Sequence, residues 1–450
     1  MCETNFIYWG GVMGGRINGS CLQSSAASGE RVILHSDLNS FFASVEIARE
    51  PSLAPYPVAV CGSEEERHGI VLAKNRLAAE HGVRTGETVG TARAKCPGLR
   101  TVEPHYDDYA EFSQRAREIY RGVTDLVESF GIDECWLDVS GSRYLFGEGW
   151  EIAERLRREI RETLGITVSV GVSFCKVFAK LGSDLKKPDA VTQIPRESFR
   201  EKIWCLPASA LLGVGPAAAR KLSERSVNTI GELACTPPEL LSSYLGKAGR
   251  LLWTYANGLD AAPVSPENEE PAKSVGRGCT PPEDLTTDEE AEALIVGLAM
   301  DVCHTLRQIG MAACGVVVAV RDSALCVKEF SAPLPRPTQS ALVLAEQVFR
   351  LFCRSYNHAR PVRSLTVRAI RLTPRGAPRQ LDLFEPAGEE ERRLLLCEAV
   401  DELRARFGKG VLVPASTLAA PSVHEFGFQA CSLSEKAEST SEKEKIPKRD

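Results

Sequence analysis

Two adjacent acids inside a short apolar run constrain the fold of this 450-residue chain more than any other feature. The run covers residues 130–139 (FGIDECWLDV), and its acids are Asp133 and Glu134. Because the run is short and rich in β-forming residues, it predicts a buried strand or hairpin. Neighbouring strand residues point to opposite faces, so Glu134 and Trp136 share one face and Asp133 lies on the other. Burying both acids is costly, so they either reach a solvated turn or face a cation.

A second predicted strand also carries an acid near its end. Residues 32–38 (VILHSDL) contain Asp37, and a helix-start signal follows at Asn39 or Ser40. An acid at the end of a buried strand, beside a second acidic strand, is a common way to hold hard divalent cations. Mg²⁺ prefers a few carboxylate oxygens, water and substrate phosphates, and three carboxylates with two metals suit in-line phosphoryl transfer.

The two acidic motifs, HSDLNSFFASVE and GIDECWLDV, resemble those of the Y-family (translesion) DNA polymerases. The resemblance extends over about residues 31–384, and the motifs recur in the family's order. It implies an α+β multi-domain fold. The expected architecture is a right-hand polymerase with a ferredoxin-like palm, small fingers, a helical thumb with a helix-hairpin-helix, and an α/β little-finger domain.

The family resemblance implies template-directed, DNA-dependent DNA synthesis of low fidelity, in which dNTPs are added to a primer 3′-hydroxyl during translesion synthesis. It assigns Asp37, Asp133 and Glu134 as catalytic residues. With the carbonyl of Leu38, these residues are the expected ligands of two Mg²⁺ ions. Phe42, five residues after Asp37, is the expected steric gate, a bulky ring that blocks a 2′-hydroxyl.

Three residues are expected to contact the triphosphate. They are Lys187, the last lysine of the family-like stretch KVFAKLGSDLKKP, together with Arg76 and Phe41. The family usually carries a Tyr and an Arg where this chain has Arg76 and Ala79, and the planar guanidinium of Arg76 offers a replacement contact. Lys74 is another candidate. The alternatives are a solvated basic helix face for Arg76 and Lys74, a helix C-terminus capped by lysines for Lys187, and the helix core for Phe41 and Phe42.

Glycine turns and arginines predict duplex binding. Gly213 and Gly215 precede a helical stretch in the manner of a helix-hairpin-helix, and Gly246 with Lys247 forms a weaker second copy. Residues 347–381 contain eight arginines and no acid. The predicted final strand, 362–372, carries three of them on both faces, which leaves its DNA-facing side open: Arg363, Arg368 and Arg371.

The segment after this basic track resembles the peptide that docks on the bacterial sliding clamp (beta subunit). Its sequence is QLDLF, in which Leu383 and Phe384 would fill an apolar pocket beside Gln380 and Leu381. Prolines on both sides favour an extended segment. The expected partners are therefore primer–template DNA, dNTP and the clamp, with no membrane and a monomeric chain.

Composition places few further limits on function. The net charge is −6, so any DNA-binding surface is local. The 15 cysteines form no Cys-x-x-Cys pair, which is typical of reduced thiols in a cytoplasmic protein. No apolar run is long enough to span a membrane.

Two rival functions follow from the residues. A catalytically silent clamp- and DNA-binding damage-response scaffold is favoured by Arg76 and Ala79, but the three retained acids speak against it. A nucleotide cyclase also uses paired acids, but it has no need of the glycine turns or the clamp peptide.

Periodicity adds an expected helix over 109–128 and another from Trp150 to Leu164. For 274–375 it predicts the order strand, helix, strand, strand, helix, strand, with helices over 288–309 and 339–356. The resulting division is a disordered leader or misassigned start (1–30), palm (31–39 and 106–195), fingers (40–105), thumb (196–262), linker (263–273), little finger (274–375), clamp-binding peptide (376–388), a helical appendage (389–429, with its helix over 389–407) and a disordered tail (430–450).

Overall fold

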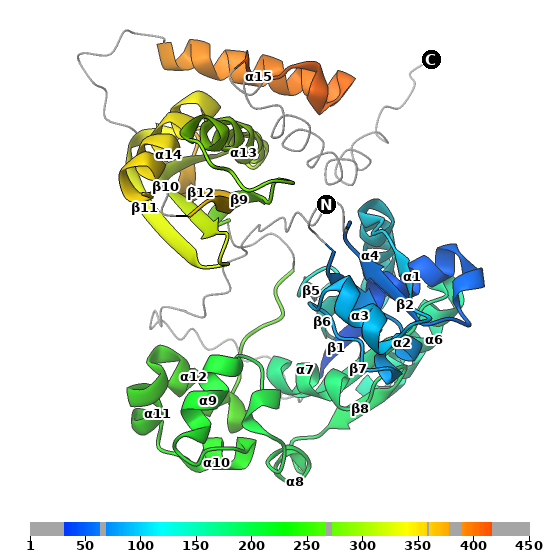
Figure 1. Ribbon diagram of the computed structural model, residues 1–450. Coiled ribbons are helices and arrows are strands. Elements are labelled where there is room, and N and C mark those ends of the chain that lie inside the picture. The colour runs from blue at the N-terminus through cyan, green and yellow to red at the C-terminus, as the bar shows by residue number, and fades with distance from the viewer. Residues whose placement is uncertain (1–30, 64–68, 267–271, 358–359, 378–388, 416–450) are drawn as a thin grey trace, which may run out of the picture. The chain divides into compact units, whose positions relative to one another are not determined.

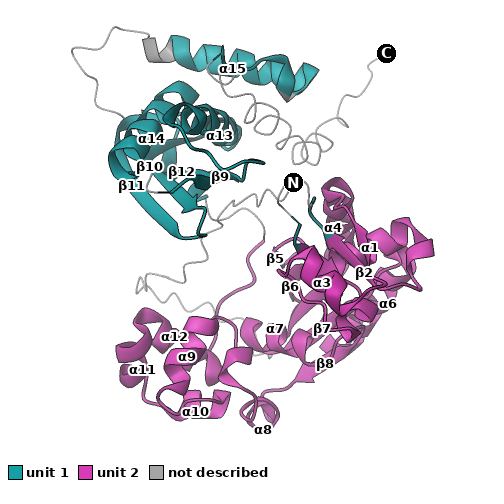
Figure 2. Cartoon of the chain, viewed as in Figure 1, with its two compact units in different colours: residues 1–19, 61–70, 270–450 teal, residues 20–60, 71–269 magenta. Residues whose placement is uncertain are grey.

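A computed structural model describes residues 31–63, 69–266, 272–357, 360–377 and 389–415. The predicted leader, the clamp-binding peptide from Gln380 to Phe384 and the predicted tail lie outside these residues. Figure 2 shows the chain divided into two compact units, one of residues 20–60 and 71–269 and one that contains 61–70 and 270–450.

A five-stranded sheet forms the centre of the first unit, with the strand order β5-β6-β1-β7-β8. The middle strand, β1, is antiparallel to both of its neighbours, and β7 and β8 are parallel. All six residues of β1 are buried, as expected for the central strand of a covered sheet. The bounds are β1 (Ile33–Leu38), β5 (Val127–Ser129), β6 (Glu134–Asp138), β7 (Val168–Ser173) and β8 (Val191–Ile194).

Alternation along β1 separates two layers of helices. Leu34 and Leu38 join the core formed with α4 and α6, where Ser36 also bonds Tyr120. Ile33 packs with Ala179 of α7 instead. His35 and Asp37 therefore face α7, because they share the face of Ile33. The helices of this sheet are α1 (Phe41–Arg49), α4 (Tyr106–Arg121), α5 (Arg143–Phe146), α6 (Gly149–Leu164) and α7 (Lys176–Leu185).

The close approach of α7 to the sheet depends on a glycine. A Cβ atom on Gly171 would lie 1.9 Å from the carbonyl oxygen of Ala179, so only glycine fits there. Gly171 pairs with His35 in the register of β7 and β1. The small residue thus holds α7 directly above the strand that carries His35 and Asp37.

The prediction of one helix over 109–128 is wrong at its C-terminal end. The helix stops at Arg121, and Glu128 lies in strand β5. Gly122 follows the last helical residue, and Thr124 then bonds the backbone, donating to the Asp138 carbonyl at 2.7 Å and accepting from Leu126 N–H at 3.2 Å. Such local side-chain bonds compete with helix continuation.

Two smaller substructures complete the first unit. A three-stranded sheet of order β3-β2-β4 carries two short helices, and a helical group shares one apolar core with α7 and the end of β8; Figure 1 shows α9 to α12 gathered together. Their elements are η1 (Pro51–Leu53), β2 (Val58–Cys61), β3 (Val71–Lys74), α2 (Arg76–Glu80), α3 (Val89–Lys95), β4 (Arg100–Val102), α8 (Phe199–Ile203), η2 (Ala208–Ala210), α9 (Pro216–Ser223), α10 (Ile230–Cys235), α11 (Pro238–Leu245) and α12 (Lys247–Ala256).

The second unit has a four-stranded sheet of order β11-β10-β12-β9, with α13 and α14 on one face (Figure 1). The predicted order of strands and helices is confirmed. A further helix, α15, is joined to α13 by Arg307, whose guanidinium bonds both oxygens of Asp401 at 2.6 and 2.8 Å. The bounds are β9 (Ser274–Cys279), α13 (Asp288–Gln308), β10 (Met311–Asp322), β11 (Val327–Thr338), α14 (Ala341–Ser355), β12 (Val362–Pro374), α15 (Glu389–Phe407) and η3 (Lys409–Val411).

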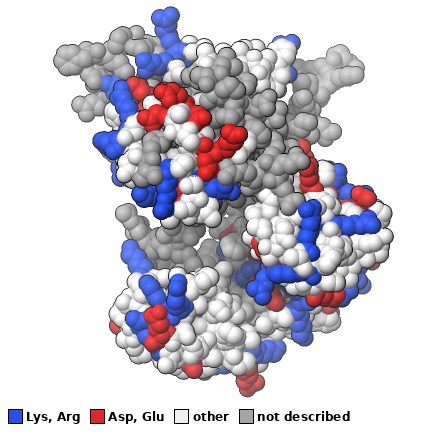
Figure 3. Space-filling model, viewed as in Figure 1, with Lys and Arg blue, Asp and Glu red and all other residues white. Residues whose placement is uncertain are grey.

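Surface composition agrees with the modest net charge. On the face in Figure 3, basic and acidic side chains are interspersed.

Among the residues that the structure describes, no helix is both long and apolar enough to cross a membrane.

Candidate active site

The structure brings the three predicted acids to one end of two neighbouring strands. Asp37 of β1 pairs with Glu134 of β6 in the antiparallel register. One step further, the Leu38 N–H donates to the carbonyl oxygen of Asp133 at 3.0 Å. Asp37 is 5 % exposed, and Asp133 and Glu134 are half-buried. The hairpin formed by β5 and β6 therefore carries its two acids to the end of β1, as the sequence predicts.

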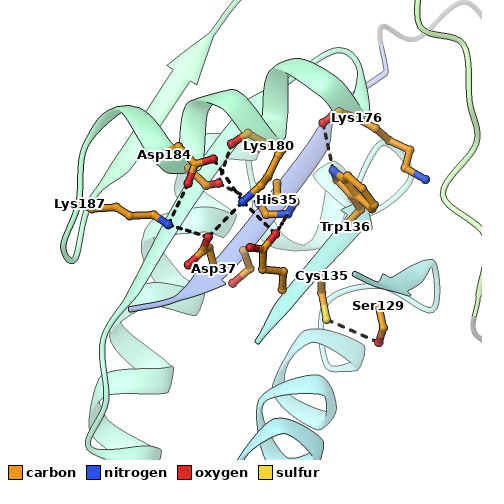
Figure 4. A network of polar contacts seen from close by, with 12 residues as sticks. His35, Asp37, Ser129, Cys135, Trp136, Lys176, Lys180, Asp184 and Lys187 are labelled. Atoms are coloured by element: carbon orange, nitrogen blue, oxygen red, sulfur yellow. Dashed lines mark hydrogen bonds and ion pairs between the residues drawn. The ribbon is translucent and has the colours of Figure 1, made fainter. Parts of the chain in front are cut away.

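Two lysines from the α7 region reach this group of acids (Figure 4). The Lys180 ammonium lies 2.9 Å from Glu134 Oε2 and 3.3 Å from Asp37 Oδ2. The Lys187 ammonium lies 2.7 Å from the same Asp37 oxygen. Asp184 joins the two lysines, at 3.2 Å from Lys180 and 2.9 Å from Lys187. Cations therefore neutralise the buried carboxylates, which would otherwise be costly to desolvate.

Electrostatics distinguish the two adjacent acids. Burial, together with the nearby charges of Glu134 and Asp37, raises the pKa of Asp133 to about 6. Burial also acts to raise the pKa of Glu134, but the adjacent His35 ring and Lys180 ammonium outweigh it and lower the value to about 2. For Lys180, desolvation acts to lower the pKa, and its carboxylate partners raise it above the ordinary value. A bound cation would relieve the electrostatic repulsion between Asp133 and the neighbouring carboxylates of Glu134 and Asp37.

His35 lies beneath Glu134 and is fully buried. The Ser183 hydroxyl donates to the Lys180 carbonyl at 2.8 Å, so it accepts from His35 Nδ1 at 2.9 Å. This network assigns the proton to Nδ1. Burial lowers the pKa of His35. His35 Nε2 and Glu134 Oε2 lie 3.2 Å apart, and both are buried without a hydrogen bond of good geometry. Glu134 thus keeps a lone pair that a cation can use.

The donor set fits a hard divalent metal. Carboxylate and carbonyl oxygens from Asp37, Leu38, Asp133 and Glu134 meet at one edge of the sheet. No three His, Cys, Asp or Glu side chains form a ready-made metal cage within the described part of the chain. An open set of few carboxylates is the arrangement that Mg²⁺ completes with water and substrate phosphates.

Phe42, the expected steric gate, belongs to a cluster of rings between α1 and α4. Its ring is half-buried and stacks on Tyr109, with centroids 4.2 Å apart and planes at 10°. Tyr106 meets Phe42 edge-on at 6.1 Å. The Phe41 side chain is 3 % exposed within the core of the central sheet. A contact from Phe41 to a triphosphate would therefore come from its backbone.

Of the expected triphosphate residues, the structure brings Lys187 to the acids. Arg76 lies on the exposed face of α2 and forms an ion pair with Glu80 at 2.5 Å. Lys74 donates to the Thr85 hydroxyl at 3.2 Å. Arg76 of α2 and Lys74 of β3 are thus engaged with neighbours on the surface of the small inserted sheet and its helix.

The predicted glycine turns precede helices in the helical group. Gly213 lies before α9 with φ +89°, and Gly246 joins α11 to α12 with φ +63°. Both angles are in the left-handed region that favours glycine. A Cβ atom added at Gly215 or Gly246 would meet nothing within 4 Å, so these turns are open to a ligand. Lys247 is the first residue of α12.

The strand register separates the three arginines of β12, which the sequence could not do. Arg277 of β9 bonds Thr305 of α13, so Gly276 and Gly278 face away from the helices. Gly276 pairs with Arg368, which places Arg368 on this open face, 3.2 Å from Glu329. A hollow of about 180 Å³ lies there, lined by residues that include Gly276, Gly278, Ser364, Thr366 and Arg321. A register shift at Arg321 interrupts the strand pairing at Arg363, and Arg371 has a left-handed backbone with φ +54°. Simple alternation of faces therefore does not apply to these two arginines.

Sequence reasoning missed three residues of the site: His35, Lys180 and Asp184. A signal existed for one of them. His35 is two residues before Asp37 on one strand, so it must share that face. Lys180 and Asp184 are one helical turn apart and therefore neighbours, but their distance from the acids depends on how closely α7 packs on the sheet.

Comparisons with known proteins show the family and the fold of this chain. Residues 36–184 match the impB/mucB/samB family, and residues 272–383 match the C-terminal domain of that family. A DNA polymerase IV of Acetivibrio thermocellus is 48% identical over 380 residues, 84% of this chain and 95% of that protein. The DNA polymerase IV of Moorella thermoacetica is 39% identical, over 87% of this chain and 97% of the relative.

A further relative, the DNA polymerase IV 2 of Bacillus subtilis, is 33% identical over 87% of this chain and 95% of the relative. A solved chimera of the Y-family DNA polymerases Dbh and Dpo4 superposes with a TM-score of 0.69 at 24% identity, covering 76% of this chain and 99% of the chimera. This likeness shows the fold. Together, the matched family domains and the near full-length relatives place the chain in the Y-family of DNA polymerases, with the bacterial DNA polymerases IV, as a DNA-directed DNA polymerase.

Proposed function

We propose that this polymerase extends a primer 3′-hydroxyl by Mg²⁺-dependent phosphoryl transfer at Asp37, Asp133 and Glu134. The observation that carries the proposal is the register of β1 and β6, which pairs Asp37 with Glu134 and bonds Leu38 to Asp133. Two bound Mg²⁺ ions supply a lowered pKa for the primer hydroxyl and charge stabilisation for the leaving oxygen. The acids, with the Leu38 carbonyl, are the protein ligands for these ions.

The lysines around the acids have a second role in this proposal. Lys180 and Lys187 neutralise Asp37 and Glu134 by direct contact. Lys187 is the more exposed of the two, with 38% of its side chain accessible against 14% for Lys180. Lys187 is thus free to turn from Asp37 to a triphosphate, where an ammonium offsets the charge that develops on the leaving pyrophosphate.

We further propose that the substructures form the parts of a right-hand polymerase. We assign 31–39 and 106–195 to the palm, 40–105 to the fingers, 196–262 to the thumb and 274–375 to the little finger, with 263–273 as the linker. Open glycine turns in the helical group support backbone contacts to DNA phosphates, with Lys247 beside one of them. Arg368 and the hollow on the open sheet face support a second contact with the duplex.

Single-turnover primer extension tests the proposed reaction. With primer–template and dNTP, addition should require Mg²⁺, stop when the metal is chelated, and continue past an abasic template site at a reduced rate. Metal-independent addition would contradict the proposed chemistry. Complete arrest at the abasic site, with normal extension on undamaged DNA, would show that the enzyme does not bypass abasic lesions.

The same assay separates the two candidate phosphate contacts. Lys187→Ala should lower the maximal rate by about 10-fold or more, because a charge that stabilises the leaving phosphate acts in the transition state. Arg76→Ala should raise the KM for dNTP if Arg76 replaces the usual family contacts. Glu80→Ala is the matched control for loss of the surface ion pair of Arg76. Unchanged kinetics in Arg76→Ala would mean that Arg76 does not contact the triphosphate. Of these two candidates, Lys187 alone would then remain.

Clamp binding is proposed from sequence alone, because residues 380–384 lie outside the described part of the chain. Replacing Leu383 and Phe384 by Ala should spare extension of short primers and remove stimulation by a loaded sliding clamp. Each side chain contributes about 1.5–3 kcal/mol on full burial, part of which is lost to ordering the peptide. Full clamp stimulation of the double variant, with no peptide binding in calorimetry, would exclude this partner contact.

A further inference from the structure

A buried carboxylate that the polymerase chemistry leaves unused lies close to the proposed sugar gate. Glu46 is 2% exposed and belongs to α1. It follows Phe42 by four residues, so the two side chains share one face of the helix. Burial of a charged group is costly unless it is paired and hydrogen-bonded. Its partners therefore indicate what Glu46 is retained to hold.

Three groups surround the Glu46 carboxylate. The Tyr109 hydroxyl donates to Oε1 in a short hydrogen bond. His105 Nδ1 lies 3.0 Å from Oε1, and Arg49 Nη1 donates to Oε2 at 2.8 Å. Arg49 is itself held by Asp108, 2.6 Å from its Nε. Burial acts to raise the pKa of Glu46, but the hydrogen bonds from Tyr109, His105 and Arg49 outweigh it and hold the pKa below its usual range.

Tyr109 connects this carboxylate to the gate. Its side chain is fully buried on α4, with its hydroxyl on Glu46 and its ring stacked on Phe42 at 4.2 Å. Tyr106 meets the Tyr109 ring edge-on at 5.8 Å. Helix α1 therefore supplies both the gate and the carboxylate that fixes the ring beneath it. A charge-assisted hydrogen bond is about twice as strong as a neutral one, which suits it to holding a ring in one orientation.

We propose that Glu46 is a positioning residue for sugar selection, acting through Tyr109 on the gate residue Phe42. The proposal rests on the proposed role of Phe42 as the steric gate. Without the Glu46 bond, the Tyr109 ring is free to tilt, and Phe42 then moves with the ring on which it stacks. A displaced Phe42 leaves room for a 2′-hydroxyl while the metal-binding acids stay in place.

The test compares incorporation of dNTP and rNTP by Glu46→Gln, Tyr109→Phe and the double variant. Each single variant should lower the dNTP-over-rNTP ratio of kcat/KM by about tenfold, the scale of a hydrogen bond to a charged group. The double variant should show no further loss, because Glu46→Gln removes the charge and Tyr109→Phe removes the donor of one and the same charge-assisted hydrogen bond. Where Glu46→Gln does not fold, Tyr109→Phe carries the test. General destabilisation lowers both rates together and leaves the ratio unchanged.

Two controls separate the possible failures. Tyr120→Phe removes another buried hydroxyl from α4, the helix of Tyr109, where it bonds Ser36 at 2.7 Å. This variant should leave the dNTP-over-rNTP ratio of kcat/KM unchanged. Phe42→Ala measures the gate itself. If Phe42→Ala loses discrimination while both single variants keep it, Glu46 has no positioning role. If Phe42→Ala also keeps discrimination, the gate assignment fails and the inference fails with it. An equal loss in Tyr120→Phe would also overturn the inference.

Discussion

Replacement of Asp133 or Glu134 by Ala is expected to lower nucleotide addition on the order of 10³-fold or more, while DNA binding persists. A bound metal contributes several kcal/mol of transition-state charge stabilisation, and each 1.36 kcal/mol is about a factor of ten in rate. Asp37 and Glu134 are paired across β1 and β6, so removal of either neighbouring acid leaves an incomplete ligand set. Single-turnover extension and fluorescence anisotropy of labelled primer–template measure the two effects separately.

Glu128→Gln is the matched control for this prediction. Glu128 is another acid of the same sheet, and it pairs with Lys176 at 2.5 Å, away from the proposed ligands. This variant should keep nucleotide addition within a few-fold of the unmodified enzyme. Near-normal extension by either Asp133→Ala or Glu134→Ala would contradict the two-metal assignment. Loss of DNA binding together with activity would mean that the substitutions disturb the fold.

Replacement of Phe42 by Ala should permit ribonucleotide incorporation, lowering the preference for dNTP on the order of 10²-fold. Discrimination by the fit of a pocket reaches this scale when steric contact decides which substrate enters. Phe42 is half-buried and supported by Tyr109, so its ring is positioned by packing while one side stays accessible. Competing dNTP and rNTP in single-nucleotide extension gives the ratio directly.

Phe42→Tyr is the control for this second prediction, because it keeps a bulky ring at the same position. The Tyr variant should retain discrimination, and the Ala variant should retain dNTP addition because no metal ligand is changed. An unchanged dNTP-over-rNTP ratio in Phe42→Ala would make Phe42 a core residue with no part in sugar selection.

The central acids were predictable because the signal is local. An acid at a strand end is visible in the sequence around Asp37, and the pair Asp133–Glu134 interrupts an apolar run in which burial has to be compensated. Strand pairing then needs only two neighbouring segments to meet in the correct register. The resemblance supplied that pairing, and the structure has Asp37 opposite Glu134.

The lysines depend on packing that a local pattern does not contain. Lys180 reaches Asp37 because α7 lies against the sheet at Gly171, where a Cβ atom would collide with the helix backbone. Nothing in the helical periodicity of α7 fixes that approach. The wrong helix end at Arg121 has a related cause, since Thr124 takes backbone partners from β6 and from its own turn.

The faces of the last strand were unpredictable for a different reason. Simple alternation cannot sort Arg363, Arg368 and Arg371, because one register shift and one left-handed residue interrupt the strand. A bulge of this kind reverses which face later residues occupy. Only the pairing of Arg368 with Gly276 shows which arginine lies on the open face.

The number of metal ions bound by the assembled complex tests the central claim most directly. Mn²⁺ in place of Mg²⁺ can be counted by electron paramagnetic resonance on a complex with dideoxy-terminated primer–template and the next dNTP. Two ions should bind to the unmodified enzyme, and fewer than two to Glu134→Ala at the same free Mn²⁺ concentration. Two ions of equal affinity in both proteins would contradict the assignment of Asp37, Asp133 and Glu134 as the metal ligands.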